Sequence, residues 1–222
     1  MKTQVLHWNN VNSEDDFSIT YLLYMEGKNI ELISRIRNLP VEVIQEHIIQ
    51  SKMLLKGKGK KSTDQSFFVE LLAATKEERI RILEESSIDD KNELINYLKT
   101  AIGKINNAED KMIAIWIAGQ IKAISLLPIL HAEAGHKHGG VRRMVCSALR
   151  KIPDKSNIEV LHRTLHDSKP QVRQYSAKAL AEIGDEKTLK RLRGLINNPN
   201  ELEYVKRSYQ QAIEKIQEGI KN

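Results

Sequence analysis

The chain has 222 residues, of which 41% are hydrophobic and 29% are charged, a composition typical of a soluble globular protein with one large or two small domains. It contains no apolar run of membrane-spanning length and no secretory leader, so we expect a cytoplasmic protein that does not enter a membrane. A single cysteine, Cys146, excludes an internal disulfide and is expected to be a small buried thiol. Scarce aromatic residues, at 5%, favour stacked helices over a β-sandwich.

The charge is unevenly distributed along the chain. Residues 137–222 carry 18 Lys and Arg against 10 Asp and Glu, a net charge of +8, whereas residues 1–136 carry 17 against 19, a net charge of −2. A basic half indicates an acidic partner, and nucleic acid is the commonest one. The alternative is that helical repeats carry lysines for solubility alone.

Three zones precede the long C-terminal part of the chain. Residues 1–17 form a polar, acidic leader. Within residues 18–55, Gly27 closes a first helix, Asn29 begins a second helix, and residues 38–40 make a short turn into a third. Residues 56–63 contain four lysines and two glycines, the composition of a flexible linker.

The arrangement of two short helices, a turn and a third helix resembles the helix-turn-helix of LuxR-type regulators and of some helicase tails. The matching residues are Gly27, Ile33, Ser34, Leu39, Ile44, His47 and Ile48. The resemblance implies DNA contacts through the third helix and phosphate contacts from the second. The candidate residues are Arg35, Arg37, Gln45, Gln50 and Lys52. Glu42 and Glu46 on the third helix would repel phosphate, and the alternative is that this unit packs against the repeats or a protein partner.

The C-terminal part repeats itself. Val141-Arg142 opens a stretch that returns at Val172-Arg173 and at Val205-Lys206, with spacings of 31 and 33 residues. Each opening precedes the same apolar frame, which comprises Ala148, Leu149 and Ile152, then Ala179, Leu180 and Ile183, then Ala212, Ile213 and Ile216. A nearly apolar segment at residues 110–124 reads as an earlier copy and as a central, buried helix. A fixed period in this range predicts units that bury their apolar faces by stacking.

Each unit is predicted to be a pair of antiparallel helices, with turns at residues 139–140, 167–170 and 197–200. Over residues 108–219 this pattern resembles the short class of HEAT-like repeats, of about thirty residues each. The predicted fold is therefore all-α: an α-solenoid of HEAT-like helix pairs over residues 64–222, preceded by the small helix-turn-helix unit. In the family, an Asp in the turn and the Arg after Val form a ladder between repeats. Here Asp167 and Arg173 match, but no Asp precedes Val141 or Val205, so we expect a partial ladder.

In such a stack, equivalent residues of successive second helices line up in rows that face outwards, typically on the concave side. The rows are Arg142, Arg173 and Lys206; Arg143, Gln174 and Arg207; Ser147, Lys178 and Gln211; Lys151, Glu182 and Lys215. The basic members, with Arg173 set aside for the ladder, are candidates for binding nucleic acid or an acidic partner segment. They are Arg142, Arg143, Lys151, Lys178, Lys206, Arg207 and Lys215.

No catalytic motif stands out: we find neither a phosphate-binding glycine loop nor a nucleophile elbow. Five histidines are interpreted as surface residues at helix ends: His131, His136, His138, His162 and His166. No His is followed by Glu, so the di-iron site of some HEAT-like proteins is not expected, nor is any other metal or cofactor. Another HEAT-like family removes alkylated bases; Tyr175, Tyr204 and Tyr209 are plausible groove aromatics, but no catalytic Asp can be placed beside them.

Three hypotheses follow from these patterns. The first is a non-catalytic scaffold that associates with DNA through the helix-turn-helix unit and the basic concave face together. The second is a protein–protein adaptor whose basic groove holds an acidic partner segment. The third is a HEAT-like enzyme of DNA base excision. No small-molecule substrate is evident from the sequence.

Overall fold

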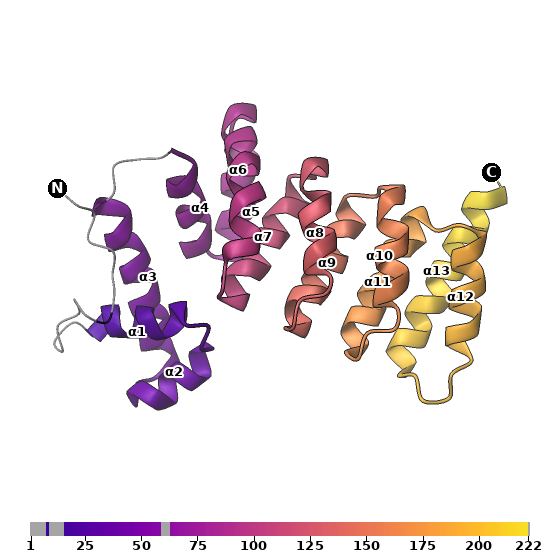
Figure 1. The fold of residues 1–222 in the computed structure, drawn as a ribbon, viewed down its shortest axis with the longest axis horizontal. Helices are drawn as coiled ribbons and strands as arrows, with labels where there is room; N and C mark the ends of the chain where they lie inside the picture. The colour runs from indigo at the N-terminus through magenta and orange to yellow at the C-terminus, as the bar shows by residue number, and fades with distance from the viewer. Residues whose placement is uncertain (1–7, 9–15, 59–62, 222) are drawn as a thin grey trace. The chain divides into compact units, whose positions relative to one another are not determined.

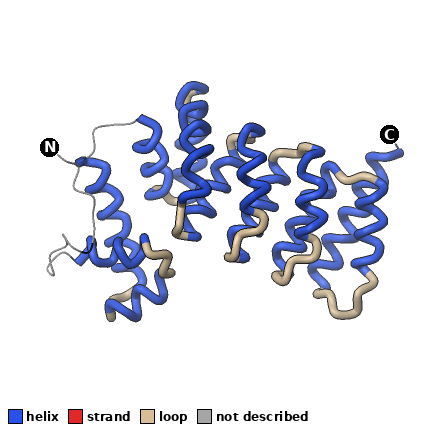
Figure 2. Tube along the Cα trace, in the orientation of Figure 1, coloured by secondary structure: helices blue, strands red, loops and turns tan. Residues whose placement is uncertain are grey.

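The computed structural model describes Trp8, residues 16–58 and residues 63–221. Every regular element in these ranges is a helix, and Figure 2 shows no strand among them, so the predicted all-α solenoid class is confirmed for the part described. The described residues separate into two compact units. The first contains the residues up to 97 together with 104–110, and the second contains 98–103 and the residues from 111 on.

The first unit begins with the three predicted helices, α1 (Asp16–Met25), α2 (Ile30–Arg37) and α3 (Val41–Lys58). Gly27 adopts a φ of +82°, a conformation that favours glycine, and terminates α1. The side chain of Asn29 accepts a hydrogen bond from the backbone N–H of Leu32 at 2.8 Å and so caps α2. Buried side chains hold the three helices together: Leu23, Tyr24, Ile33, Ile44 and Ile48.

Three further helices follow, α4 (Thr63–Ala73), α5 (Lys76–Glu85) and α6 (Ile88–Ala101), and a 3₁₀ turn, η2 (Ile102–Lys104). Thr75 and Glu78 form a capping box at the start of α5. The linker expected at residues 56–63 is shorter than predicted, because α3 continues through Lys58 and α4 begins at Thr63. Residues 59–62 lie outside the described ranges. The division between the two units falls at residues 98–110, later in the chain than that linker.

The second unit contains successive helix pairs (Figure 1). Its elements are α7 (Ala108–Gln120, of which the unit holds the residues from 111 on), η3 (Ile124–Leu126), α8 (Leu127–Glu133), α9 (Gly139–Lys151), η4 (Lys155–Asn157), α10 (Ile158–Thr164), α11 (Pro170–Ile183), α12 (Glu186–Ile196) and α13 (Glu203–Lys221). Helices α8, α10 and α12 are the first helices of three repeats, and α9, α11 and α13 are their second helices. Each first helix packs on its second helix, and α9, α11 and α13 pack on one another in order.

The repeated apolar frame builds this stack as predicted. Val141, Val172 and Val205 open the three second helices and are each fully buried. The earlier copy in α7 is also buried, with Ile115 and Ile117 at 0% exposure. Burying one such aliphatic side chain contributes about 1.5–3 kcal/mol, so the frame supplies much of the energy that holds neighbouring repeats in register. One detail differs from prediction: residues 139–140 are the first turn of α9 rather than the loop before it.

Candidate functional site

A ladder of buried ion pairs runs between successive repeats. Its three rungs are Lys111 with Glu133, Arg142 with Asp167, and Arg173 with Glu201. In the middle rung, Arg142 donates from Nε to Asp167 Oδ2 at 2.6 Å and from Nη2 to Oδ1 at 2.7 Å. The last rung has the same two-bond geometry, at 2.7 and 2.6 Å. The ladder is therefore more complete than the sequence suggested, because Glu201 and Glu133 supply carboxylates where Asp is missing from the turns.

The two arginine rungs lower the pKa of the carboxyl groups that they bind. Burial opposes the charge of Asp167, but hydrogen bonds from Arg142 and from the backbone N–H of Lys169 outweigh it and lower the pKa of the carboxyl group. Burial likewise opposes the charge of Glu201, and the bonds from Arg173 and the N–H of Leu202 lower its pKa. Helices α9 and α11 are thus each clamped to the turn of the next repeat by a charged pair.

Two sequence-based assignments change as a result. Arg142 was predicted to face a partner, but its guanidinium is occupied by Asp167 and by the carbonyl oxygens of residues 136 and 137. Tyr209 was considered as a groove aromatic, but it is fully buried and its hydroxyl donates to Glu201 at 3.0 Å. Both side chains hold the stack together. Arg142 binds the turn of the next repeat, and Tyr209 binds Glu201, the partner of Arg173 in the repeat before.

Other predicted residues do come together on the outer surface of the second helices. Arg143 of α9 lies over the ring of Tyr175 of α11, with 5.3 Å from Cζ to the ring centroid. Lys178, one turn further along α11, lies over the same ring at 5.5 Å. A second contact of this kind joins Lys151 of α9 to Trp116 of α7 at 5.5 Å. We call the surface formed by Trp116, Arg143, Lys151, Tyr175 and Lys178 the second-helix face.

The remaining predicted cations divide into paired and exposed ones. Lys215 forms an ion pair with Glu182 at 2.7 Å, which reduces the charge of the row that they share. Arg207 is exposed on α13 at the position equivalent to Arg143, and Lys206 is half-exposed beside it. Of the two aromatic residues of the second-helix face, Tyr175 was considered as a groove aromatic for base excision, whereas Trp116 was expected in a central, buried helix. Trp116 is instead half-buried and contacts Lys151.

In the three-helix unit, the predicted DNA contacts are only partly free. Arg37 donates to the backbone oxygen of Asp16 at 2.9 Å and pairs with its carboxylate, so it ties α2 to α1. Arg35 is exposed on α2. On α3, Gln45 is exposed and Gln50 donates to Glu46 at 3.1 Å. The side chain of Lys52 lies outside what the structure describes.

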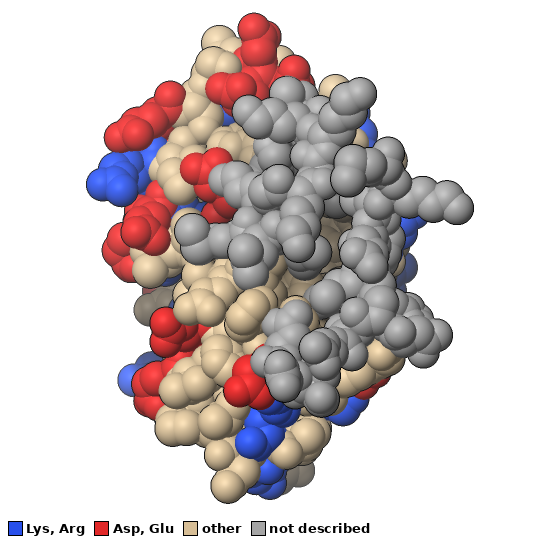
Figure 3. Space-filling model, turned by 90° about the vertical axis from the view of Figure 1, so that its left-hand side faces the viewer, with Lys and Arg blue, Asp and Glu red and all other residues tan. Residues whose placement is uncertain are grey.

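Acidic side chains are exposed on the three-helix unit. Figure 3 shows several acidic groups along one edge of the view and fewer basic ones among the atoms not drawn in grey. Glu42 and Glu46 are both exposed on α3. Negative side chains on α3 oppose contact with phosphate, as the sequence already indicated.

Two histidines have structural roles rather than the predicted surface positions. His162 is 2% exposed and its Nε2 lies 2.8 Å from Thr188 Oγ1, while its Nδ1 has no hydrogen-bond partner among the described residues. His131 occupies the equivalent position one repeat earlier, with Nε2 2.7 Å from Asn157 Oδ1. Burial, followed by the charge of Arg191, lowers the pKa of His162. Among the residues described, no group of three or more His, Cys, Asp or Glu side chains is placed to hold a metal ion.

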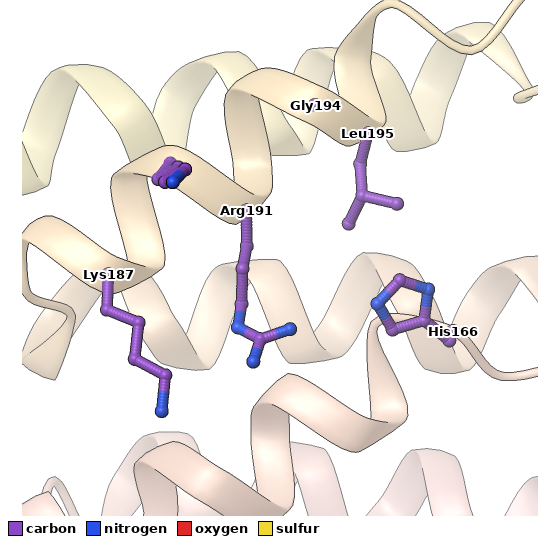
Figure 4. Close-up of a pocket in the computed structure, with 6 residues that line it drawn as sticks. His166, Lys187, Arg191, Gly194 and Leu195 are labelled. Carbon is purple, nitrogen blue, oxygen red and sulfur yellow. The ribbon is translucent and has the colours of Figure 1, made fainter.

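A basic surface that the sequence reasoning missed lies on α12. Lys187, Lys190 and Arg191 line a cavity of about 510 Å³ together with His166, Gly194 and Leu195 (Figure 4). Spacings of three and four residues place the cations on one side of the helix, and this was readable from the sequence.

The repeated helix pairs and their inter-repeat ladder define an α-solenoid, a class that presents long surfaces to partners. Residues 126–214 match the family model of HEAT repeats, which supports the predicted resemblance to HEAT-like repeats. A comparison with curated proteins found no match to the chain. HEAT repeats typically form protein-interaction scaffolds. Within the described ranges, no helix combines the length and apolar character needed to cross a membrane.

Proposed function

We propose that the protein is a non-catalytic scaffold whose second-helix face binds an acidic segment of a partner protein. The observation that carries this proposal is the ring of Tyr175, which has Arg143 on α9 and Lys178 on α11 over it. Among the described residues, neither cation forms an ion pair with a carboxylate.

A cation held over an aromatic ring keeps its charge while its position becomes fixed. A carboxylate of a partner can therefore contact Arg143 or Lys178 without first displacing an internal acid, and an apolar group of the partner can contact the ring. Trp, Tyr and Arg are the residues that dominate the energy of protein interfaces. The second-helix face combines all three types, with Trp116 beside Lys151 at one end.

The same contacts favour a protein partner over DNA. Association with DNA through both the three-helix unit and the repeats requires many free cations, since each neutralised phosphate contributes to affinity. Arg37, Arg142 and Lys215 are instead engaged by Asp16, Asp167 and Glu182. A local cluster of cations around an aromatic ring suffices for an acidic peptide. Tyr209 lies in the core, so it is not accessible to a base as the base-excision hypothesis requires.

The proposal is tested with a fluorescein-labelled polyglutamate peptide and the 222-residue chain carrying Trp8→Phe, so that Trp116 is the remaining tryptophan. We expect salt-sensitive binding that changes the fluorescence of Trp116. The double substitution Arg143→Glu with Lys178→Glu should weaken binding about 10-fold or more, equivalent to about 1.4 kcal/mol.

The control is Lys155→Glu with Arg163→Glu, which changes the net charge equally at two exposed positions on η4 and α10, outside the second-helix face. Equal weakening by both double variants would mean that net charge alone drives binding, and the proposed site would be wrong. Duplex DNA is measured in parallel. If it binds more tightly than the peptide and depends on Arg143 and Lys178, the DNA hypothesis replaces the adaptor.

A further inference from the structure

The cavity along α12 lies on the first helices, away from the second-helix face. Figure 4 shows the side chains of Lys187, Arg191 and Leu195 projecting from α12 towards α10, with His166 at the end of that helix. The cavity thus has a basic end, made by the lysines and Arg191, and a less polar end at Leu195 and His166.

The positive charge at this site is only partly neutralised. Lys187 pairs with Glu159 of α10 at 2.5 Å. Lys190 and Arg191 are exposed, and within the described ranges neither has a hydrogen bond from its side chain or an ion pair. Like charges three and four residues apart on a helix repel one another, so this arrangement is unfavourable unless an anion is bound. The charge of Arg191 also reaches His162, whose pKa is lowered chiefly by burial and then by Arg191.

Gly194 makes the less polar end accessible. It lies inside α12 and is exposed, and a Cβ atom built on it would meet no other atom within 4 Å. Internal packing therefore does not require glycine here, nor is its φ among the positive values that favour glycine. Glycine weakens a helix relative to alanine. Its missing side chain allows another chain to approach the helix backbone between Arg191 and Leu195.

The previous repeat provides an internal comparison. Its equivalent groove, on α8 and α10, is lined by Val160 and Arg163 at the positions that Arg191 and Gly194 occupy on α12. The earlier groove also contains Asp167, which is already bound to Arg142. Exposed cations combined with an open helix surface are therefore a feature of the α12 groove and not of every repeat.

We propose that the α12 groove binds an acidic peptide segment that carries one bulky apolar side chain. Carboxylates of the peptide pair with Lys190 and Arg191, and its apolar side chain rests on Leu195 beside His166, above Gly194. The proposal is independent of the second-helix face. If both sites are used, the scaffold holds two acidic segments at once, one on each layer of helices.

The test uses the full chain and two labelled polyglutamate peptides, one with a central leucine and one with serine in its place. Binding is followed by fluorescence anisotropy, and its location by the backbone amide resonance of Gly194, which is assigned from its loss in Gly194→Ala. We expect the leucine peptide to shift this resonance and to bind more tightly than the serine peptide. Lys190→Glu with Arg191→Glu should weaken the leucine peptide about 10-fold.

Matched glycine variants separate contact from helix stability. Gly194→Ala should weaken the leucine peptide about three-fold or more, because the added methyl group occupies the contact surface. Gly219→Ala, an equally open position on α13, should leave binding unchanged. Thermal unfolding of each variant verifies that it is folded.

Two results would overturn the proposal. One is a Gly194 resonance that does not move with the leucine peptide. The other is an equal shift with inorganic phosphate or duplex DNA, which would assign the groove to phosphate groups instead. The proposed binding to the second-helix face is tested separately, because the fluorescence of Trp116 reports on that face and not on α12.

Discussion

The ion pair between Arg142 and Asp167 leads to a specific prediction for the stability of the variant Asp167→Asn. Substitution by Asn keeps the size of the side chain and an oxygen that can still accept from the N–H of Lys169, a bond of 2.8 Å. It removes the negative charge and turns an NH₂ group towards one of the two Arg142 donors. The pair is largely buried, with 14% of the Arg142 side chain and 8% of the Asp167 side chain exposed.

The expected loss of stability is estimated from the two hydrogen bonds between Arg142 and Asp167. Charge-assisted bonds contribute roughly 1.5–3 kcal/mol each and neutral bonds about 1 kcal/mol. Asn loses one bond and weakens the other, while Arg142 retains the backbone oxygens of residues 136 and 137 at 2.8 and 3.1 Å. We therefore expect Asp167→Asn to lower the free energy of unfolding by roughly 3 kcal/mol. For a chain of this size that corresponds to a melting temperature roughly 6–12 °C lower.

The assay is equilibrium unfolding in denaturant, with Glu182→Gln as the control. The Lys215–Glu182 pair is exposed, with 54% and 37% of the two side chains accessible, so its loss should cost about 0–1 kcal/mol. A cycle with Arg142→Met and the double variant gives the coupling energy between Arg142 and Asp167, which should be at least about 1 kcal/mol. A loss no larger than the control, or a coupling energy near zero, would refute the reasoning.

The pH dependence gives an independent check on the same pair. The pKa of Asp167 is lowered in the folded state, so its contribution is complete above the unfolded pKa of about 4 and is lost as the pH falls through the lower folded value. The difference in stability between the natural protein and Asp167→Asn should therefore shrink as the pH falls below about 4. A difference that stays constant down to strongly acidic pH would show that the charge of Asp167 does not contribute.

Two other predictions concern packing. Cys146 is fully buried, and burial raises the pKa of its thiol. The thiol should therefore react with a thiol reagent only when the protein unfolds, and rapid labelling of the native protein would contradict this. Gly184→Ala should lower the free energy of unfolding by about 1–3 kcal/mol, because the new Cβ would lie 2.4 Å from Ile216 Cδ1. In the same assay, Gly219→Ala should leave stability unchanged or raise it slightly. Equal stability of the two glycine variants would contradict the packing seen at Gly184.

The stack itself was readable from the sequence. Apolar residues that recur at fixed positions of a 31- to 33-residue period are buried when successive helix pairs stack. Val141, Val172 and Val205 were therefore correctly assigned to the interior. Local signals were equally informative for the three-helix unit. Gly27 and Asn29 terminate and begin helices through their own backbone and side-chain chemistry, which depends little on the rest of the chain.

The sequence did not reveal which cations are free. Arg142 and Arg207 look alike in the repeat pattern, yet the first is occupied by Asp167, 25 residues away, while the second is exposed. The partner of Arg173 is Glu201, which no motif indicated. An ion pair forms wherever two opposite charges lie close together in the fold, and sequence spacing does not determine which side chains those are.

The amino-acid sequence by itself thus determined the helices, their pairing and the buried frame, because these follow from local propensity and from the periodicity of apolar residues. The tertiary structure alone decided the surface: which charges are neutralised between repeats, where Tyr175 receives Arg143 and Lys178, and where Gly194 leaves α12 open. Burial depends on a pattern repeated many times along the chain. A binding surface depends on a few individual side chains, and their neighbours are fixed only when the repeats stack.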